Sequence, residues 1–121
     1  MKTMLIAFES PEAFAARTTP DETKRNAYWG AWMAYSKAMN DITLDGLALQ
    51  GPETATRVKV RNGERIVEDG PFADSKEQLG GYFIIDTPDM ETALDWAAKC
   101  PAAEDALVEA RAVPDYGQNQ D

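Results

Sequence analysis

The most informative stretch for the architecture is Tyr82-Phe83-Ile84-Ile85-Asp86-Thr87-Pro88-Asp89, because it joins a strand directly to the start of a helix. Its first half is a near-continuous apolar run, which predicts a buried strand. Thr87 then predicts a helix N-cap, and Pro88 suits the first helical position, where no N–H donor is needed. The helix is expected to end at about Cys100, since Pro101 cannot continue it. Its apolar side would consist of Met90, Ala93, Leu94 and Ala97.

The same order of strand, Thr-Pro-Asp and helix occurs near the N-terminus. Residues 4–8 form a short apolar run and predict a buried strand. Thr19 repeats the N-cap and Pro20 the first helical position, while Glu22 stands where it can close a capping box. The helix is predicted over residues 20–39. Its apolar side is a stripe at three- and four-residue spacing, formed by Tyr28, Trp32, Tyr35 and Met39.

A hairpin is predicted in the middle of the chain. Residues 54–60 alternate in the manner of a strand, and residues 64–68 return as a second arm. Between them lies Asn62-Gly63, a pair typical of the type I′ turn because both of its central positions need positive φ.

The remaining segments supply a short helix, two strands and a tail. One helical turn is expected around residues 12–16, and a strand over 42–50 with a bulge or turn at Asp45-Gly46. A last strand is expected over 106–113. The polar residues 114–121 predict a flexible tail, so the domain itself is expected to cover residues 1–113.

This order of elements predicts an α+β domain. The two strand-to-helix units resemble the halves of a split βαβ arrangement, which favours an antiparallel sheet with both helices on one face. The other face of such a sheet needs cover. A second copy of the chain is the simplest cover, so we expect a homodimer.

Composition narrows the classes of function. The 121 residues carry 12 basic and 21 acidic side chains, and the net charge of −9 disfavours direct nucleic-acid binding. The chain has no histidine and a single cysteine, which excludes a Ser-His-Asp triad, a His-ligated zinc site and a four-thiolate metal site. We therefore expect no metal and no cofactor. Without a signal-like or membrane-spanning segment, a cytoplasmic location is expected.

A nine-residue motif identifies a family resemblance. The segment Asp69-Gly70-Pro71-Phe72-Ala73-Asp74-Ser75-Lys76-Glu77 resembles the DGPFAETKE signature of the DGPF subfamily of YCII-related domains, with Asp74 and Ser75 in place of Glu and Thr. The similarity continues through residues 78–82, 96–103 and 108–111, so it covers nearly the whole chain.

The resemblance implies a ferredoxin-like βαββαβ fold with an extra hairpin, assembled as a dimeric α+β barrel. It also implies a role tied to transcription, because some relatives associate with sigma factors. More distant YCII-related proteins are suspected enzymes with a His on the first helix and an Asp nearby. That pair cannot be carried over to this chain, which has no histidine.

Asp69 is the leading candidate for a functional residue. Ahead of Gly-Pro at a strand end, it can act as a general base or accept a hydrogen bond from a ligand, or simply form a turn. Lys76 and Glu77 are candidates for binding charged ligand groups, with an exposed charge pair as the alternative. Tyr28 belongs to the predicted core stripe or to an apolar pocket. Trp29 lies off that stripe and indicates a cleft or a partner surface.

Two functions from different classes follow. The first is a small dimeric ligand-binding or regulatory module that has no chemistry of its own and works with small molecules or the transcription machinery. The second is a His-independent enzyme, with Asp69 as general acid or base and Lys76, Tyr28 or Tyr35 orienting a small substrate.

Overall fold

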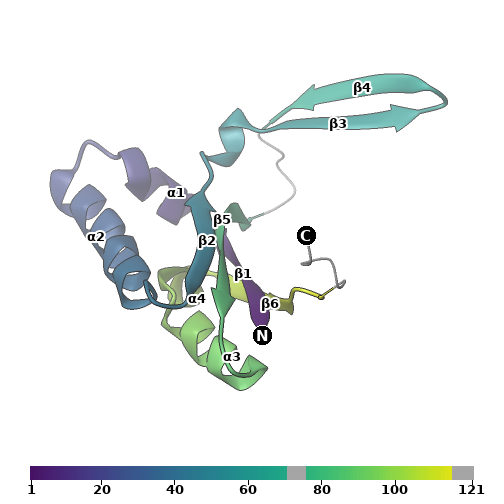
Figure 1. Cartoon of the computed structure of the whole chain (residues 1–121). Coiled ribbons are helices and arrows are strands. Elements are labelled where there is room, and N and C mark those ends of the chain that lie inside the picture. The colour runs from purple at the N-terminus through teal and green to yellow at the C-terminus, as the bar shows by residue number, and fades with distance from the viewer. Residues whose placement is uncertain (71–75, 116–121) are drawn as a thin grey trace.

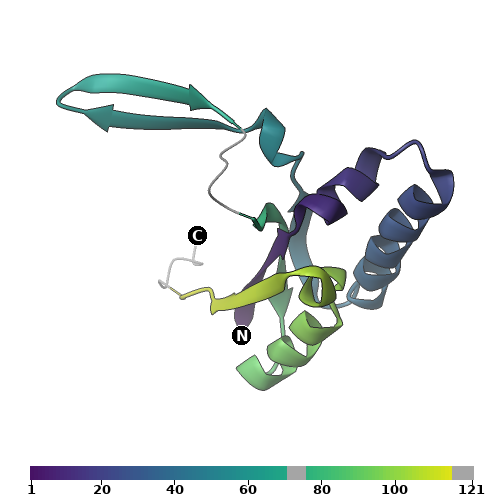
Figure 2. The same ribbon diagram turned by 180° about the vertical axis from the view of Figure 1, so that it is seen from behind.

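A computed structural model describes residues 1–70 and 76–115 of the chain. Its centre is a four-stranded antiparallel sheet in the order β2-β5-β1-β6, with helices on one face and a separate two-stranded hairpin projecting from the body (Figures 1 and 2). The sheet strands are β1 (Lys2–Glu9), β2 (Thr43–Ala48), β5 (Gln78–Asp86) and β6 (Leu107–Ala112). The predicted α+β class with an antiparallel sheet is therefore confirmed.

Four helices pack beside the sheet in the described part of the chain. They are α1 (Pro11–Thr18), α2 (Glu22–Ala38), α3 (Met90–Lys99) and α4 (Pro101–Asp105). The expected single turn around residues 12–16 is a longer helix, because Ser10 Oγ accepts a hydrogen bond from the Ala13 N–H at 3.1 Å and Pro11 occupies the first turn. None of the helices of residues 1–70 and 76–115 is long and apolar enough to cross a membrane.

The helix caps differ from the sequence prediction. The N-cap of α2 is Asp21 rather than Thr19, and Asp21 Oδ1 accepts hydrogen bonds from Thr23 N–H at 3.1 Å and Lys24 N–H at 3.2 Å. Asp89 likewise caps α3. A carboxylate is favoured over a hydroxyl here because its charge also complements the positive end of the helix dipole. Each helix consequently begins beyond the Thr-Pro pair.

The predicted hairpin is confirmed. It consists of β3 (Thr56–Arg61) and β4 (Glu64–Asp69), paired antiparallel. Asn62 and Gly63 have φ angles of 52° and 77°, as the type I′ turn requires. In β2 the pairing with β5 shifts register between Thr43 and Asp45, beside the predicted Asp45-Gly46 irregularity.

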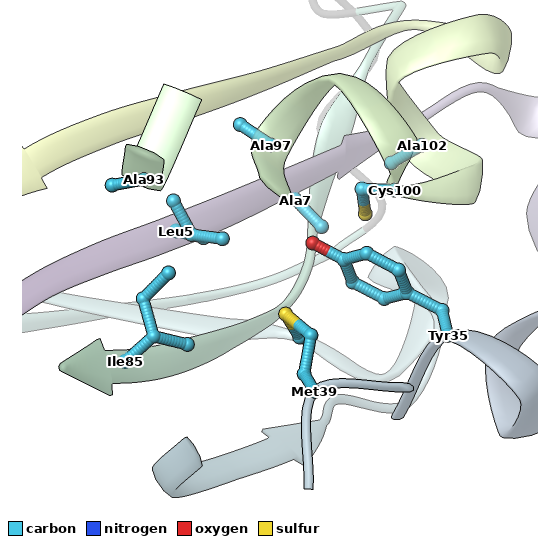
Figure 3. Packing of buried hydrophobic residues seen from close by; sticks show 9 residues of the cluster. All are labelled: Leu5, Ala7, Tyr35, Met39, Ile85, Ala93, Ala97, Cys100 and Ala102. Carbon is cyan, nitrogen blue, oxygen red and sulfur yellow. The ribbon is translucent and has the colours of Figure 1, made fainter. Parts of the chain in front are cut away.

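The core lies between the sheet and the helices. Residues Thr3, Leu5 and Ala7 of β1 are buried on this side, and they alternate with half-buried residues that point the other way. Figure 3 shows the side chains of Tyr35 and Met39 reaching toward the sheet. The buried apolar cluster consists of Leu5, Ala7, Tyr35, Met39, Ile85, Ala93, Ala97, Cys100 and Ala102.

Within residues 1–70 and 76–115 no helix lies on the opposite face of the sheet, and we call it the open face. Its central residues in β1 are Met4, Ile6 and Phe8, all half-buried. The strand register places Ile84, Tyr82, Leu79 and Leu107 beside them. This face is apolar at its centre, and whether a second copy covers it stays a prediction.

Met39 and Met33 give a matched test of this core. Met39 is fully buried, so Met39→Ala should lower the free energy of unfolding by about 2–5 kcal/mol through lost burial and a residual cavity. Met33 lies on α2, the helix that Met39 caps, and is 71% exposed, so Met33→Ala should change stability by less than about 0.5 kcal/mol. Urea titration followed by far-UV circular dichroism measures both. An equal loss of unfolding free energy in the two variants would contradict the described packing of α2.

Cys100 gives a second test, by its reactivity. Burial raises the pKa of its thiol to about 11, so almost no thiolate exists near neutral pH. The folded protein should therefore react with Ellman's reagent at about pH 8 only as fast as it unfolds. Addition of denaturant should release one rapidly reacting thiol. Fast reaction without denaturant would mean that Cys100 is accessible.

Candidate functional site

A pocket of about 420 Å³ opens between α2 and the β2–β5 part of the sheet. Its lining comes from the end of β1, from α1 and α2, and from strands β2 and β5. The volume is that of a site for a small molecule rather than for a polypeptide.

Aromatic rings form much of the pocket wall. Trp32 and Phe83 lie nearly parallel, with ring centroids 6.3 Å apart and an interplanar angle of 16°. Tyr28 meets Trp29 edge to face at 4.9 Å. Tyr28 and Trp32 share one face of α2 because they are four residues apart, and Trp29 follows Tyr28 directly. Phe83 reaches the pocket because its side chain points to the helix-covered face of β5.

A buried polar cluster of Glu9, Arg17 and Tyr28 lies at one end of the pocket. Arg17 Nη2 contacts Glu9 Oε2 at 2.6 Å, and Arg17 Nε donates to Tyr28 Oη at 2.9 Å. The Tyr28 hydroxyl in turn donates to Glu9 Oε1, which closes the ring of interactions. The side chains of Glu9 and Arg17 are only 2% and 8% exposed, so this is an ion pair inside the protein.

Arg17 also connects the cluster to the backbone of the sheet. Its Nη1 donates to the carbonyl oxygen of Leu49, and its Nη2 to that of Gly80 at 3.2 Å. The Trp29 indole N–H donates to the Arg17 carbonyl at 3.0 Å. One side chain at the end of α1 thus holds β1, α2, β5 and the segment after β2 in register.

The charges within the cluster compensate one another. Burial opposes the charge on Arg17, but the hydrogen bond with Tyr28 and the charge of Glu9 outweigh it, so the pKa of Arg17 is raised. Burial and the neighbouring Glu9 carboxylate raise the pKa of the Tyr28 hydroxyl, which therefore stays protonated. The cluster presents no net charge to the pocket.

Two glycines make room for this arrangement. A Cβ on Gly80 would lie 1.9 Å from Glu9 Oε2, so only glycine leaves space for the carboxylate. A Cβ on Gly81 would lie 2.6 Å from the Leu47 carbonyl oxygen of the neighbouring strand. The close approach that Gly80-Gly81 suggests in the sequence therefore serves both the cluster and the pairing of β2 with β5.

The structure places the predicted site residues in two separate regions. Tyr28 and Trp29 line the pocket, whereas Asp69, Lys76 and Glu77 are exposed and are not among the lining residues. Asp69 ends β4, and its Oδ1 accepts a hydrogen bond from Thr56 Oγ1 at 3.0 Å across the hairpin. Residues 71–75 of the motif lie outside the described residues. A functional role for Asp69, Lys76 and Glu77 stays a prediction.

Sequence reasoning missed Glu9 and Arg17. A signal for Glu9 was present in the sequence. Every second residue of β1 is buried, and Glu9 occupies one of these positions, so a carboxylate stands where an apolar side chain is expected. Arg17 had no such signal, since a basic residue in the last turn of a helix is normally a surface residue. No group of three or more His, Cys, Asp or Glu suited to a metal ion occurs among residues 1–70 and 76–115.

These features define a small α+β domain with a ligand-sized pocket between helix and sheet. The chain matches the YCII-related domain over residues 1–116, and it belongs to that family. A segment of 35 residues is 57% identical to an uncharacterised protein of Rhizobium meliloti (strain 1021). That segment covers 29% of this chain and only 28% of the relative.

A solved structure has a similar fold. It is 5-chloro-2-hydroxyhydroquinone dehydrochlorinase from Burkholderia phenoliruptrix AC1100, in complex with 2,5-dihydroxybenzoquinone. The TM-score is 0.58 over 98% of both chains, at 12% sequence identity. At this identity the likeness concerns the fold alone.

Gly80 and Gly30 test the polar cluster. Gly80→Ala should displace the Glu9 carboxylate and leave a buried charge without its partner, at a cost of about 3–5 kcal/mol of unfolding free energy. Gly30 lies on α2 with open space around it, so Gly30→Ala should stabilise the helix by up to about 1 kcal/mol. Thermal and urea unfolding of both variants measure this. A harmless Gly80→Ala would show that Glu9 is not held at the described position.

Proposed function

We propose that this YCII-related protein is a small-molecule-binding module whose ligand lies in the pocket between α2 and the sheet. The observation that supports this most is the buried Glu9–Arg17–Tyr28 cluster at one end of that pocket. A buried ion pair costs desolvation energy and adds little net stability. Its presence beside a pocket is better explained by the precise shape and polarity of a binding site.

The ligand we propose is a planar aromatic molecule without net charge. The Trp32 and Phe83 rings form a flat wall on which another ring can stack, and stacked or edge-to-face rings are favoured beyond simple burial. The cluster is internally neutralised, so a charged ligand would lose its hydration without gaining a counter-charge. The Ser36 residue lines the same pocket and can orient a hydroxyl or carbonyl of the ligand.

The second candidate is an enzyme acting on such a molecule. Its support is the similarity of fold to a dehydrochlorinase in complex with a dihydroxybenzoquinone, and the position of the Glu9 carboxylate next to the Tyr28 hydroxyl at the pocket. A tyrosine and a carboxylate in contact can pass a proton to or from a bound ligand. The predicted alternative with Asp69 as general acid or base would need a site outside this pocket.

Further parts of the proposal concern classification and assembly. We assign the chain to the DGPF subfamily on the motif at residues 69–77, with a ferredoxin-like arrangement that the strand order β2-β5-β1-β6 supports. We propose a homodimer, in the manner of a dimeric α+β barrel, because the open face needs cover. The transcription machinery as protein partner and the cytoplasm as location stay predictions.

Binding of neutral and charged ring compounds tests the ligand class. Hydroquinone should bind measurably by isothermal titration calorimetry, and 4-hydroxybenzoate, which has a carboxylate, should bind about tenfold more weakly or not at all. Both probes are flat and similar in size. Stronger binding of 4-hydroxybenzoate would contradict the neutral character of the site.

Matched tryptophan variants locate the binding. Trp32→Ala should abolish hydroquinone binding, whereas Trp96→Ala removes an equally half-buried ring outside the pocket and should leave the affinity unchanged. Asp69→Asn keeps an acceptor for Thr56 and should also bind normally. Loss of binding in Asp69→Asn alone would instead favour the site predicted at the motif.

A further inference from the structure

The hairpin of residues 56–69, which we call the arm, extends away from the body of the protein (Figures 1 and 2). Its strands β3 and β4 pack chiefly against each other. At its base the Gly70 N–H donates to the Ala55 carbonyl at 2.7 Å, so the chain enters and leaves the arm at one point. The arm is therefore a separate ribbon of two strands on a narrow base.

One side of the arm carries three valines, together with Arg65 opposite Val60 and the polar pair Thr56 and Asp69 at the base. The register pairs Val58 directly with Val67, and Val60 follows on the same side. These three valines are 59%, 48% and 59% exposed, respectively. The other side carries Arg57, Lys59, Arg61, Glu64 and Glu68 together with Ile66.

Such a ribbon is not stable by itself in water. A two-stranded hairpin is at best marginally stable, and needs a third strand or another packed surface to cover its apolar side. The strands of this arm are six residues each, and no helix in the described part of the chain covers the valines. A partner surface that buries the valine side would supply the missing packing.

The distribution of charge is compatible with a second copy of this chain as the partner. The arm has four of the 12 basic residues of the chain and only three of its 21 acidic ones. The rest of the chain therefore carries 18 acidic residues against 8 basic ones. The arm is weakly positive and the rest of the chain strongly negative, so the two are electrostatically complementary. The arm nevertheless extends away from the body of its own chain (Figure 1).

The direction of the arm agrees with the same partner. Both views show it extending away from α2, past the side of the sheet that bears the open face. A second copy packed on the open face would lie within reach of the arm. Isologous contacts of this kind bury the same surface on both copies and close after two.

We infer that the valine side of the arm docks on the body of a second copy of this chain. This inference rests on the proposed homodimer, and adds to it an interaction that the open face alone does not provide. Each arm exchanges the exposure of Val58, Val60 and Val67 for contact with the partner, and Arg65, which lies on the same side, faces the partner's acidic body. The arm thereby becomes ordered on assembly.

Removal of the arm tests the inference. Because Ala55 and Gly70 adjoin, residues 56–69 can be replaced by two glycines without disturbing the body. Far-UV circular dichroism should show that the body of this variant folds unchanged. Sedimentation equilibrium should show that the variant dimerises on the order of a hundredfold more weakly than the full chain. A second variant, Val58→Thr with Val60→Thr and Val67→Thr, keeps strand propensity and should also weaken the dimer.

The outcomes separate the arm from the dimer itself. Ile6→Lys on the open face should disrupt dimerisation in a chain with an intact arm. If Ile6→Lys breaks the dimer while both arm variants dimerise normally, the homodimer stands and the arm inference is wrong. If the full chain remains monomeric at a protein concentration about 100 times that used for ligand binding, both the homodimer and the docking of the arm are wrong. If the monomer binds duplex DNA and this binding needs the arm, the partner of the arm is a nucleic acid and the inference is wrong.

Discussion

The ion pair between Arg17 and Glu9 is the interaction on which the arrangement of this domain depends most. Both side chains are buried, and a buried charge without its partner costs several kcal/mol. Arg17 meets this requirement by contacting the end of β1, the Tyr28 hydroxyl of α2 and carbonyl oxygens at Leu49 and Gly80. These contacts connect α1 and α2 to the sheet in addition to the apolar packing of the core.

The same interaction determines the chemical character of the pocket. The charges and hydrogen-bond donors of Glu9, Arg17 and Tyr28 are paired with one another, so the cluster is polar but adds no net charge to the pocket. The aromatic rings of α2 and β5 then dominate the interior, and the site suits flat molecules. The remaining unusual feature, the arm with its exposed valines, lies in a different part of the molecule from the pocket.

Much of the local structure was predictable, and the exceptions have physical causes. Asn62-Gly63 identified the hairpin because few pairs tolerate positive φ at both positions. Pro101 correctly marked the end of α3. The cap of α2 was wrong by two residues, because Thr19 and Asp21 are both good caps and only the path of the chain selects one. Tyr28 and Trp29 were named as candidates, but their partners Glu9 and Arg17 were not.

Sequence patterns alone predict the α+β class, the hairpin, the apolar faces of the helices and the family, because these depend on periodicity, turn chemistry and a motif that are local in the chain. The tertiary structure decided which residues meet. Glu9, Arg17, Tyr28 and Gly80 come from four different elements, and their contacts depend on how helices cross the sheet. It also decided that Asp69 lies on the arm and outside the pocket. The periodicity of a sequence shows which side of a helix or strand is apolar, but it does not show which residues pack against that side.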